Sequence, residues 1–480
     1  MSFINGLKEE ANITYTENGG RAVSTSGSAL LDLFANIGGM RERNASDITS
    51  MWRSARLEDK ELADNLILYT RGVRNGGIGE RKIGRILLKE LAKIDPSKII
   101  RNFQTIVDCG RWDDLFIFIG TPVENEMWDF LKNRFMADLK AFSKKQPISL
   151  LAKWMKSENT SSKESKAIAR QTRIKFGLTP CQYRKTLSSL RRYIKVVENQ
   201  ISSNNWDSIN YETVPSNAMM KYRNAFGRHS KKFEEYLNKL KEGKAKINSG
   251  TLYPYDIVKK ILDGEESVVL EEQWKALPNY INEDYEVVFI TDTSGSMFCD
   301  NKRPISTAIG LTIYFAQHNK GAYHNLFMTF SEHPEVLSIK DEWNLETCVN
   351  RIRQVSWGFN TNIDAAFGLI YQIAKEANES PKAICLVSDM QIDQWGSIDS
   401  AKTITQKWAN KYEAIGLTAP KLIYWNVEAR NNAMLAKSNE NVSFVSGSGI
   451  GPFKNFITLI DKSAYEAMEE ILSQSQFCWR

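Results

Sequence analysis

The sequence has few of the residues that most zinc centres and disulfide frameworks require. Its 480 residues include six cysteines and four histidines. The cysteines lie far apart and form no CxxC pair, so neither a zinc ribbon nor a disulfide framework is expected. The histidines do not occur at helical ligand spacing beside an acidic residue, which gives histidine-based zinc hydrolysis little support.

Long apolar runs are also missing. No run reaches the roughly 20 residues that span a bilayer, and the N-terminus lacks the basic region and apolar core of a signal peptide. Hydrophobic content of 42% with 11% aromatic residues is nevertheless that of a folded globular protein. Because 480 residues exceed what one hydrophobic core usually serves, we expect two domains. The missing apolar run and signal peptide lead us to expect a cytoplasmic protein with no membrane partner.

The charge is unevenly distributed along the chain. The net charge is +6, but residues 1–250 hold about 43 basic and 28 acidic residues, whereas the remainder holds about 20 and 29. Such a split indicates two modules with different partners. We place them at residues 1–280 and 281–480. A basic first module favours a nucleic-acid partner, and the alternative is a solvated surface that happens to be rich in lysine.

Residues 1–280 show helical periodicity, with apolar side chains recurring at steps of three and four. The pattern predicts an all-helical, repeat-like array. One helix is predicted to begin at Thr179, because Thr179-Pro180-Cys181-Gln182 combines an N-cap residue, an early proline and a capping-box glutamine. Its apolar face opposes a cationic face that could neutralise phosphates, and Trp154 and Tyr193 could stack on bases. The predicted RNA-binding residues are Lys153, Lys156, Arg170, Arg173, Lys175, Arg184, Lys185, Arg191, Arg192 and Lys195.

The pattern changes near residue 281. Short apolar runs begin near residues 285, 325, 383, 422 and 442, and helical patterns lie between them. Alternation of apolar strands with helices is typical of a parallel sheet covered on both faces. We therefore expect a doubly wound, mostly parallel α/β domain after the helical array.

Oxygen-bearing side chains follow two of these predicted strands. Asp292, Ser294 and Ser296 follow the first strand, Thr361 precedes a helix, and Asp389 follows the strand that begins near residue 383. Ligand sites of such sheets form at the carboxyl ends of the strands, so these residues can converge. Carboxylates and hydroxyls are ligands for Mg²⁺, with Mn²⁺ and Ca²⁺ as alternatives. An ordinary turn that caps a helix is the structural alternative.

This constellation resembles the metal-ion-dependent adhesion site of von Willebrand factor A domains, both in its motif and in the order of its segments. The resemblance implies that Asp292, Ser294, Ser296, Thr361 and Asp389 are the metal site. The threonine departs from the family's usual Gly-Gly-Thr-like turn, since Asn360 and Asn362 flank it. An ion held by two carboxylates would retain water or accept a carboxylate from an acidic protein partner.

A basic helical part followed by such a domain resembles the Ro autoantigen proteins. That resemblance implies a TROVE-like module that binds small structured RNAs or single-stranded RNA ends. A second resemblance covers nearly the whole chain and is to the family of domain of unknown function 2828. It is carried by the segments Ser28–Phe34, Gly110–Leu115, Val214–Met219 and Leu252–Val258.

Three functions remain open from the sequence. The first is a non-catalytic RNA-binding scaffold of Ro-like type whose metal site recruits a partner. The second is a metal-dependent protein adaptor that binds no nucleic acid. The third is a magnesium-dependent phosphoesterase or nuclease in which Asp292 and Asp389 hold one ion, although neither a second acidic cluster nor a general base is evident.

Two glycine-rich strings could also bind anions. Residues 74–82 could form a phosphate loop, but they lack the Gly-Lys-Ser/Thr ending and a preceding strand, so a turn between helices is favoured. Residues 446–451 follow the last predicted strand and could form an anion nest or an ordinary loop.

Overall fold

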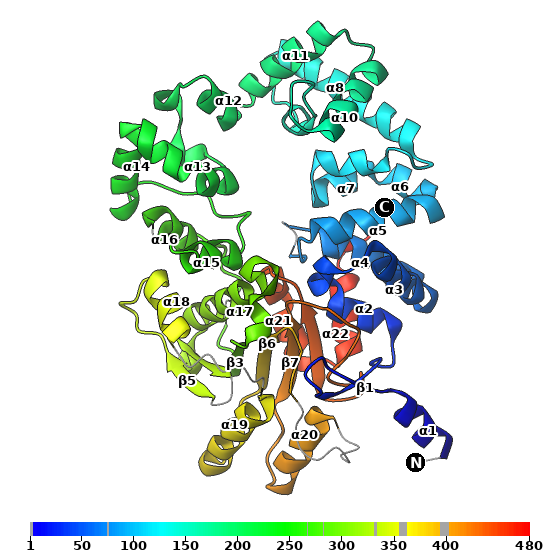
Figure 1. Cartoon of the computed structure of the whole chain (residues 1–480), viewed down its shortest axis with the longest axis vertical. Helices are drawn as coiled ribbons and strands as arrows, with labels where there is room; N and C mark the ends of the chain where they lie inside the picture. Colours follow the sequence, from blue (N-terminus) through cyan, green and yellow to red (C-terminus); the bar gives the residue numbers. More distant parts are fainter. Residues whose placement is uncertain are drawn as a thin grey trace. The chain divides into compact units, whose positions relative to one another are not determined.

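The computed structural model describes residues 3–73, 76–265, 267–281, 283–330, 334–354, 362–393 and 403–480. The chain forms two compact units. The sheet unit comprises Met1–Ile83 and Ser249–Cys478, and the helical unit comprises Gly84–Asn248 and Trp479–Arg480. These divisions differ from the boundary expected at residues 280 and 281, since residues 1–83 and 249–280 belong with the sheet. Figure 1 gives the order of the elements in each unit.

The sheet unit is built on a six-stranded sheet with the order β5-β4-β3-β6-β7-β8. Neighbouring strands are parallel except for β5, which pairs antiparallel with β4 at one edge. This confirms the predicted, mostly parallel sheet. The strands are β3 (Val287–Asp292), β4 (Leu326–Phe330), β5 (Glu335–Ser338), β6 (Ala383–Ser388), β7 (Lys421–Asn426) and β8 (Val442–Ser446).

Burial explains why these runs form central strands. Every residue of β6, β7 and β8 is buried, as expected for parallel strands with both faces covered. On β3, the ring of Phe289 stacks on Phe315 of α17 with centroids 4.0 Å apart. Helices of the sheet unit that follow residue 249 are α15 (Pro254–Leu262), α16 (Val268–Lys275), α17 (Cys299–His318), α18 (Leu345–Gln354), α19 (Ile363–Ala377), α20 (Ile404–Ala414), α21 (Phe456–Asp461) and α22 (Ala464–Leu472).

The N-terminal residues pack against this sheet. Ser446 at the end of β8 donates a hydrogen bond from Oγ to the carbonyl of Phe34 at 3.0 Å and accepts one from Gly38 N at 2.9 Å. Val23 and Met434 exchange two backbone hydrogen bonds of 2.8 Å. The elements of this segment are α1 (Phe3–Ala11), β1 (Ile13–Tyr15), β2 (Arg21–Val23), α2 (Ala29–Asn36), α3 (Ala45–Glu58) and α4 (Lys60–Arg71). The small β1–β2 hairpin was not expected in a segment predicted to be all helical.

The helical unit contains no strand within its described residues, as predicted. The predicted capping box at Thr179 is confirmed, because Thr179 Oγ1 accepts from Gln182 N at 3.3 Å and Gln182 Oε1 accepts from Thr179 N at 2.9 Å. Its α-helices are α5 (Arg81–Ile94, whose first three residues belong to the sheet unit), α6 (Pro96–Arg101), α7 (Phe103–Cys109), α8 (Glu124–Ser143), α9 (Leu151–Trp154), α10 (Lys163–Phe176), α11 (Pro180–Tyr193), α12 (Val197–Ser202), α13 (Ser216–His229) and α14 (Lys231–Lys241). Among the described helices of the whole chain, none combines the length and apolarity that a bilayer crossing requires.

Candidate functional site

The carboxyl ends of β3 and β6 bring four of the five predicted metal-site residues into one region of the sheet unit. Asp292 ends β3, and Asp389 directly follows β6, the parallel neighbour of β3. Both aspartates have no exposed surface. Ser294 is buried and Ser296 is half-buried in the turn that leads towards α17. Thr361 lies outside the described residues.

Hydrogen bonds fix the first carboxylate. Asp292 Oδ1 accepts from the backbone N of Ser294 at 2.9 Å, and Oδ2 accepts from Ser388 Oγ at 2.5 Å. The hydroxyls of Ser294 and Ser296 lie 3.1 Å apart. Ser388 is the last residue of β6, so the two strand ends are linked directly through side chains. Hydrogen bonds thus fix the positions of the side-chain oxygens of Asp292, Ser294 and Ser388 at the ends of the two strands.

Arg430, in the segment after β7, also belongs to this site, although no sequence motif points to it. Its Nη2 lies 3.1 Å from Asp389 Oδ2 and donates to the carbonyl of Ser296 at 2.7 Å. The same nitrogen lies 3.2 Å from Cys299 Sγ, and Nη1 lies 3.2 Å from Glu17 Oε2. The guanidinium is therefore a cation that the protein itself places beside Asp389. Its five donors suit it to bind several acceptors at once.

The electrostatics of the two aspartates favour a positive charge between them. Burial, and then the neighbouring charge of Asp389, raises the pKa of Asp292 to about 7. Burial also raises the pKa of Asp389, and Arg430 opposes this increase. Two buried carboxylates this close repel each other unless a cation or a proton intervenes. A divalent cation would remove this penalty in the same way.

The donors present fit a hard divalent cation, namely two carboxylates and two hydroxyls. Asp389 Oδ2 is buried, and its cationic neighbour is Arg430. Over the same residues there is no cluster of three or more His, Cys, Asp or Glu side chains suited to a metal ion. A metal here would therefore depend on hydroxyl oxygens as well as carboxylates.

The two glycine-rich strings lie against each other. A side-chain carbon added to Gly451 would lie 2.4 Å from the carbonyl oxygen of Gly77, and one added to Gly447 would lie 2.4 Å from Ile78 Cγ2. These distances are too short for any larger residue. The glycines therefore permit close packing of two loops in the sheet unit, which accounts for them without a bound phosphate.

Several of the predicted RNA-binding residues are held by other protein groups. Arg191 donates to the carbonyls of Ala152 at 2.9 Å and Met155 at 2.7 Å and to Ser157 Oγ at 2.8 Å. Burial lowers the pKa of Arg191. This arginine holds α9 and the segment that follows it against α11.

Four other predicted cations also have partners. Arg173 pairs with Glu158 at 2.9 Å, and Lys156 lies 3.8 Å from Asp113. Lys175 donates to Asn125 Oδ1 at 3.2 Å, and Lys153 lies 5.6 Å from the ring of Trp154. The Trp154 ring is covered by the guanidinium of Arg111 at 4.2 Å. Tyr193 packs edge-on against Phe142 and donates to the carbonyl of Gln146 at 3.1 Å. These contacts give both aromatic residues roles within the fold.

The remaining predicted cations are exposed. Four of them, which we call the α11 cations, are Arg184, Lys185 and Arg192 of α11 and Lys195, which lies two residues after the helix. Within the described structure none of the four has an ion pair, and the side chain of Arg184 bonds only the carbonyl of Pro180 in its own helix, at 3.3 Å. Arg184, Lys185 and Arg192 fall within roughly 100° of arc around the helix axis. Arg170 of α10 is also exposed.

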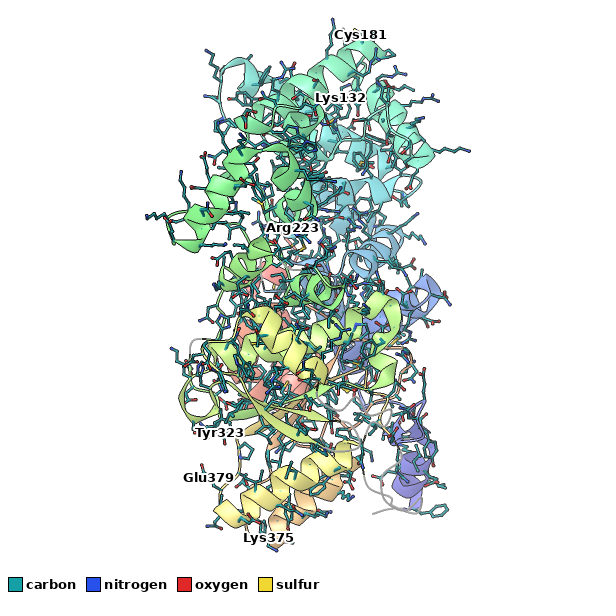
Figure 2. The ribbon with its side chains drawn as sticks, turned by 60° about the vertical axis from the view of Figure 1, so that its left-hand side comes forward. Lys132, Cys181, Arg223, Tyr323, Lys375 and Glu379 are labelled. Atoms are coloured by element: carbon teal, nitrogen blue, oxygen red, sulfur yellow. The ribbon has the colours of Figure 1, made fainter. Side chains whose placement is uncertain are left out.

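The surrounding sequence contains few acidic residues that could neutralise these cations. From Leu139 to Val197 there are 15 Lys and Arg residues and two acidic residues, Glu158 and Glu164. The whole helical unit carries 33 Lys and Arg against 17 Asp and Glu, whereas residues 1–83 carry 11 of each. The positive excess of the first 250 residues therefore lies in the helical unit. Figure 2 shows the side chains around Lys132 of α8 and Cys181 of α11.

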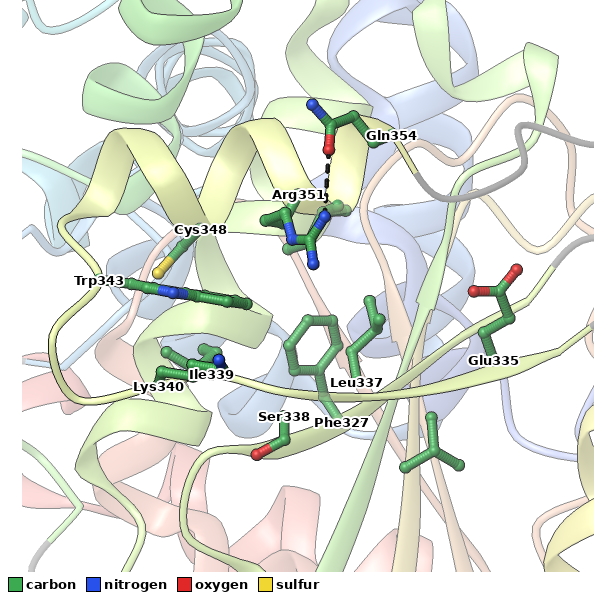
Figure 3. A pocket seen from close by; sticks show the side chains of 12 residues that line it. Phe327, Glu335, Leu337, Ser338, Ile339, Lys340, Trp343, Cys348, Arg351 and Gln354 are labelled. Carbon is green, nitrogen blue, oxygen red and sulfur yellow. Dashed lines mark hydrogen bonds between the residues drawn. The ribbon is translucent and has the colours of Figure 1, made fainter.

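A separate cavity of about 420 Å³ lies between the edge strand β5 and α18 (Figure 3). Its wall includes Trp343, and the guanidinium of Arg351 lies 5.6 Å from that ring. Gln354 accepts from Arg351 at 3.4 Å. Among the predicted metal-site and RNA-binding residues that the structure describes, none lines this cavity.

Comparisons with known proteins match the chain in two parts. Residues 148–285 match the family model described as domain of unknown function DUF2828, and residues 286–476 match the one described as domain of unknown function DUF7788. The chain is 30% identical over 485 residues to a protein of Acanthamoeba polyphaga mimivirus described as uncharacterized protein L728, covering 92% of this chain and 83% of that protein. Among solved structures, the Ro (RSR) protein of Deinococcus radiodurans aligns with 85% of this chain and 99% of its own, with a TM-score of 0.38 and 16% identity.

Proposed function

The chain belongs to the DUF2828 family, and for this member we propose a non-catalytic RNA-binding scaffold. In this proposal the helical unit holds RNA by its phosphates, and the sheet unit carries a divalent-metal site, with Mg²⁺ as its ion, that recruits an acidic protein partner. The bound RNA is a small structured RNA or a single-stranded end.

The observation that carries the RNA part is the segment Leu139–Val197, with its 15 basic and two acidic residues. A folded protein gains no stability from keeping so many like charges close together, because they repel one another. A polyanion neutralises them and releases its own counterions, which supplies binding energy without base-specific contacts. The exposed α11 cations are available for such contacts.

The observation that favours the metal part is the convergence of Asp292, Ser294, Ser296 and Asp389. Their oxygens suit a hard ion that keeps a position open for an outside ligand. When bound, the ion would supply a positive charge to which a partner's carboxylate can coordinate. The protein's own contribution is to bury the two aspartates and orient the serine hydroxyls.

The test is binding of the purified full chain to a mixed pool of structured and single-stranded RNA at moderate salt, with Mg²⁺ present. The proposal predicts RNA that is retained at its original length. No retention would refute the RNA part and leave a metal-dependent protein adaptor. Shortened RNA that disappears with Asp292→Ala would instead indicate a nuclease.

A further inference from the structure

We propose that Arg430 competes with a divalent cation for Asp389 and so sets how tightly the sheet unit binds metal. This inference rests on the metal site of the proposed function. It assigns a role to a residue outside the recognised motif, which the fold brings to the strand ends from the segment after β7.

The position of the guanidinium carries the argument. Its Nη2 contacts Asp389 Oδ2 at 3.1 Å, the carbonyl of Ser296 at 2.7 Å and Cys299 Sγ at 3.2 Å. Asp389 is fully buried, and its other oxygen, Oδ1, accepts from the backbone N of Gln391 at 3.1 Å. The cation beside Oδ2 is the guanidinium of Arg430. The guanidinium thus occupies one of the positions from which a cation could contact that oxygen.

An ion and the guanidinium cannot both contact this oxygen at low cost. Two positive charges a few ångströms apart in a buried site repel each other strongly. A metal that binds Asp389 must therefore displace Arg430 and break a charge-assisted contact. The observed metal affinity is reduced by the free energy of that displacement.

Glu17 offers the displaced guanidinium a second carboxylate. Its Oε2 lies 3.2 Å from Arg430 Nη1. The turn between β1 and β2 holds it at this edge, because Glu17 N donates to Gln391 Oε1 at 2.9 Å and Thr16 Oγ1 donates to the carbonyl of Ile392 at 2.5 Å. When Arg430 leaves Asp389, Glu17 can keep it paired. Glu17 also adds negative charge near the site, so both effects favour metal binding.

The experiment is a calorimetric titration of the full chain with Mn²⁺ alone, at low ionic strength. Arg430→Ala should bind Mn²⁺ roughly tenfold or more tightly than wild type, because a contact to a charged group is worth about 1.5–3 kcal/mol and 1.4 kcal/mol is tenfold. Glu17→Gln should bind it several-fold more weakly. Arg43→Ala is the matched control, since Arg43 donates to Asn432, two residues from Arg430, and should leave the affinity unchanged.

The outcomes separate the inference from the function on which it rests. Equal or weaker binding by Arg430→Ala, with wild type binding Mn²⁺, overturns the competition and leaves the metal site standing. Binding by Arg430→Ala and none by wild type supports the competition and refutes a metal in the native chain. No binding by either overturns both. If Arg430→Ala does not fold, Arg430→Gln keeps much of the side-chain volume without the charge and is held to the same expectation.

Discussion

The α11 cations give the RNA proposal a quantitative test. Each cation that neutralises a phosphate adds about 0.7 to the slope of log affinity against log salt for a single strand. Changing Arg184, Lys185, Arg192 and Lys195 to alanine should therefore lower that slope by about 3. Between 50 and 200 mM salt, wild type should lose roughly 50-fold more affinity than the variant. Alanine preserves the helix at the three positions within α11. Lys195 lies after the helix at a φ of 52°, where alanine is no more strained than lysine, so the fold should remain.

The assay is fluorescence anisotropy with a labelled single-stranded RNA over a salt series, and the control variant removes the same charge elsewhere. Lys8, Arg353, Lys375 and Lys382 are exposed on the sheet unit and can be changed to alanine together. If phosphate contacts are made by α11, the control keeps the wild-type slope. Equal slopes for wild type and the α11 variant would refute the reasoning, as would an equal fall in both variants.

Three further predictions follow from individual contacts. Arg191→Ala removes three hydrogen bonds to α9 and the segment that follows it. The substitution should lower the free energy of unfolding, measured by urea denaturation, by about 2–4 kcal/mol. An unchanged denaturation midpoint would contradict the structural role given to Arg191. Burial, and then the charge of Asp300, raises the pKa of Glu428 to about 7. The folded protein therefore favours protonated Glu428. Its contribution to the free energy of unfolding is complete below the ordinary glutamate pKa and is lost as the pH rises through 7. Glu428→Gln should therefore raise the melting temperature at pH 8 but not at pH 4, corresponding to about 2 kcal/mol, and equal changes at both pH values would count against it. Cys181 is exposed in the first turn of α11, so bound RNA should slow its alkylation. The rate is measured by mass spectrometry, and the peptide that contains Lys375 serves as the reference for signal intensity. An unchanged alkylation rate would mean that the RNA binds elsewhere.

The strand ends could be predicted from the sequence because parallel strands have a fixed geometry. Once β3 and β6 are recognised as apolar runs, Asp292 and Asp389 must emerge at the same edge of the sheet. The capping box at Thr179 could also be predicted, because the residues that form it are close together in the sequence. Local patterns and strand direction were enough for both features.

Arg430 and Glu17 could not be found in the same way. They are separated by 413 residues and meet through a turn and a loop, neither of which has a periodic pattern. The packing of residues 1–83 against the sheet could not be predicted from the sequence for a similar reason. Their packing depends on long-range backbone contacts such as the one between Val23 and Met434. Neither amino-acid composition nor local sequence pattern predicts such contacts.

Helical periodicity also could not separate the cations of the helical unit from one another. Arg191 and Arg192 are adjacent in sequence and alike in charge, yet one binds two backbone carbonyls and the other is exposed. The difference depends on the segment Ala152–Ser157, which folds against one side of α11. Only the tertiary structure shows which arginines are engaged within the protein and which face the solvent.

The most direct test of the central claim is to locate RNA on the chain by ultraviolet cross-linking and mass spectrometry of the cross-linked peptides. The experiment uses the wild-type chain and the mixed RNA pool at moderate salt. RNA binding by the helical unit predicts cross-links concentrated between Leu139 and Val197, and fewer of them when the α11 cations are removed. Cross-links confined to the sheet unit, or none in the helical unit, would contradict it.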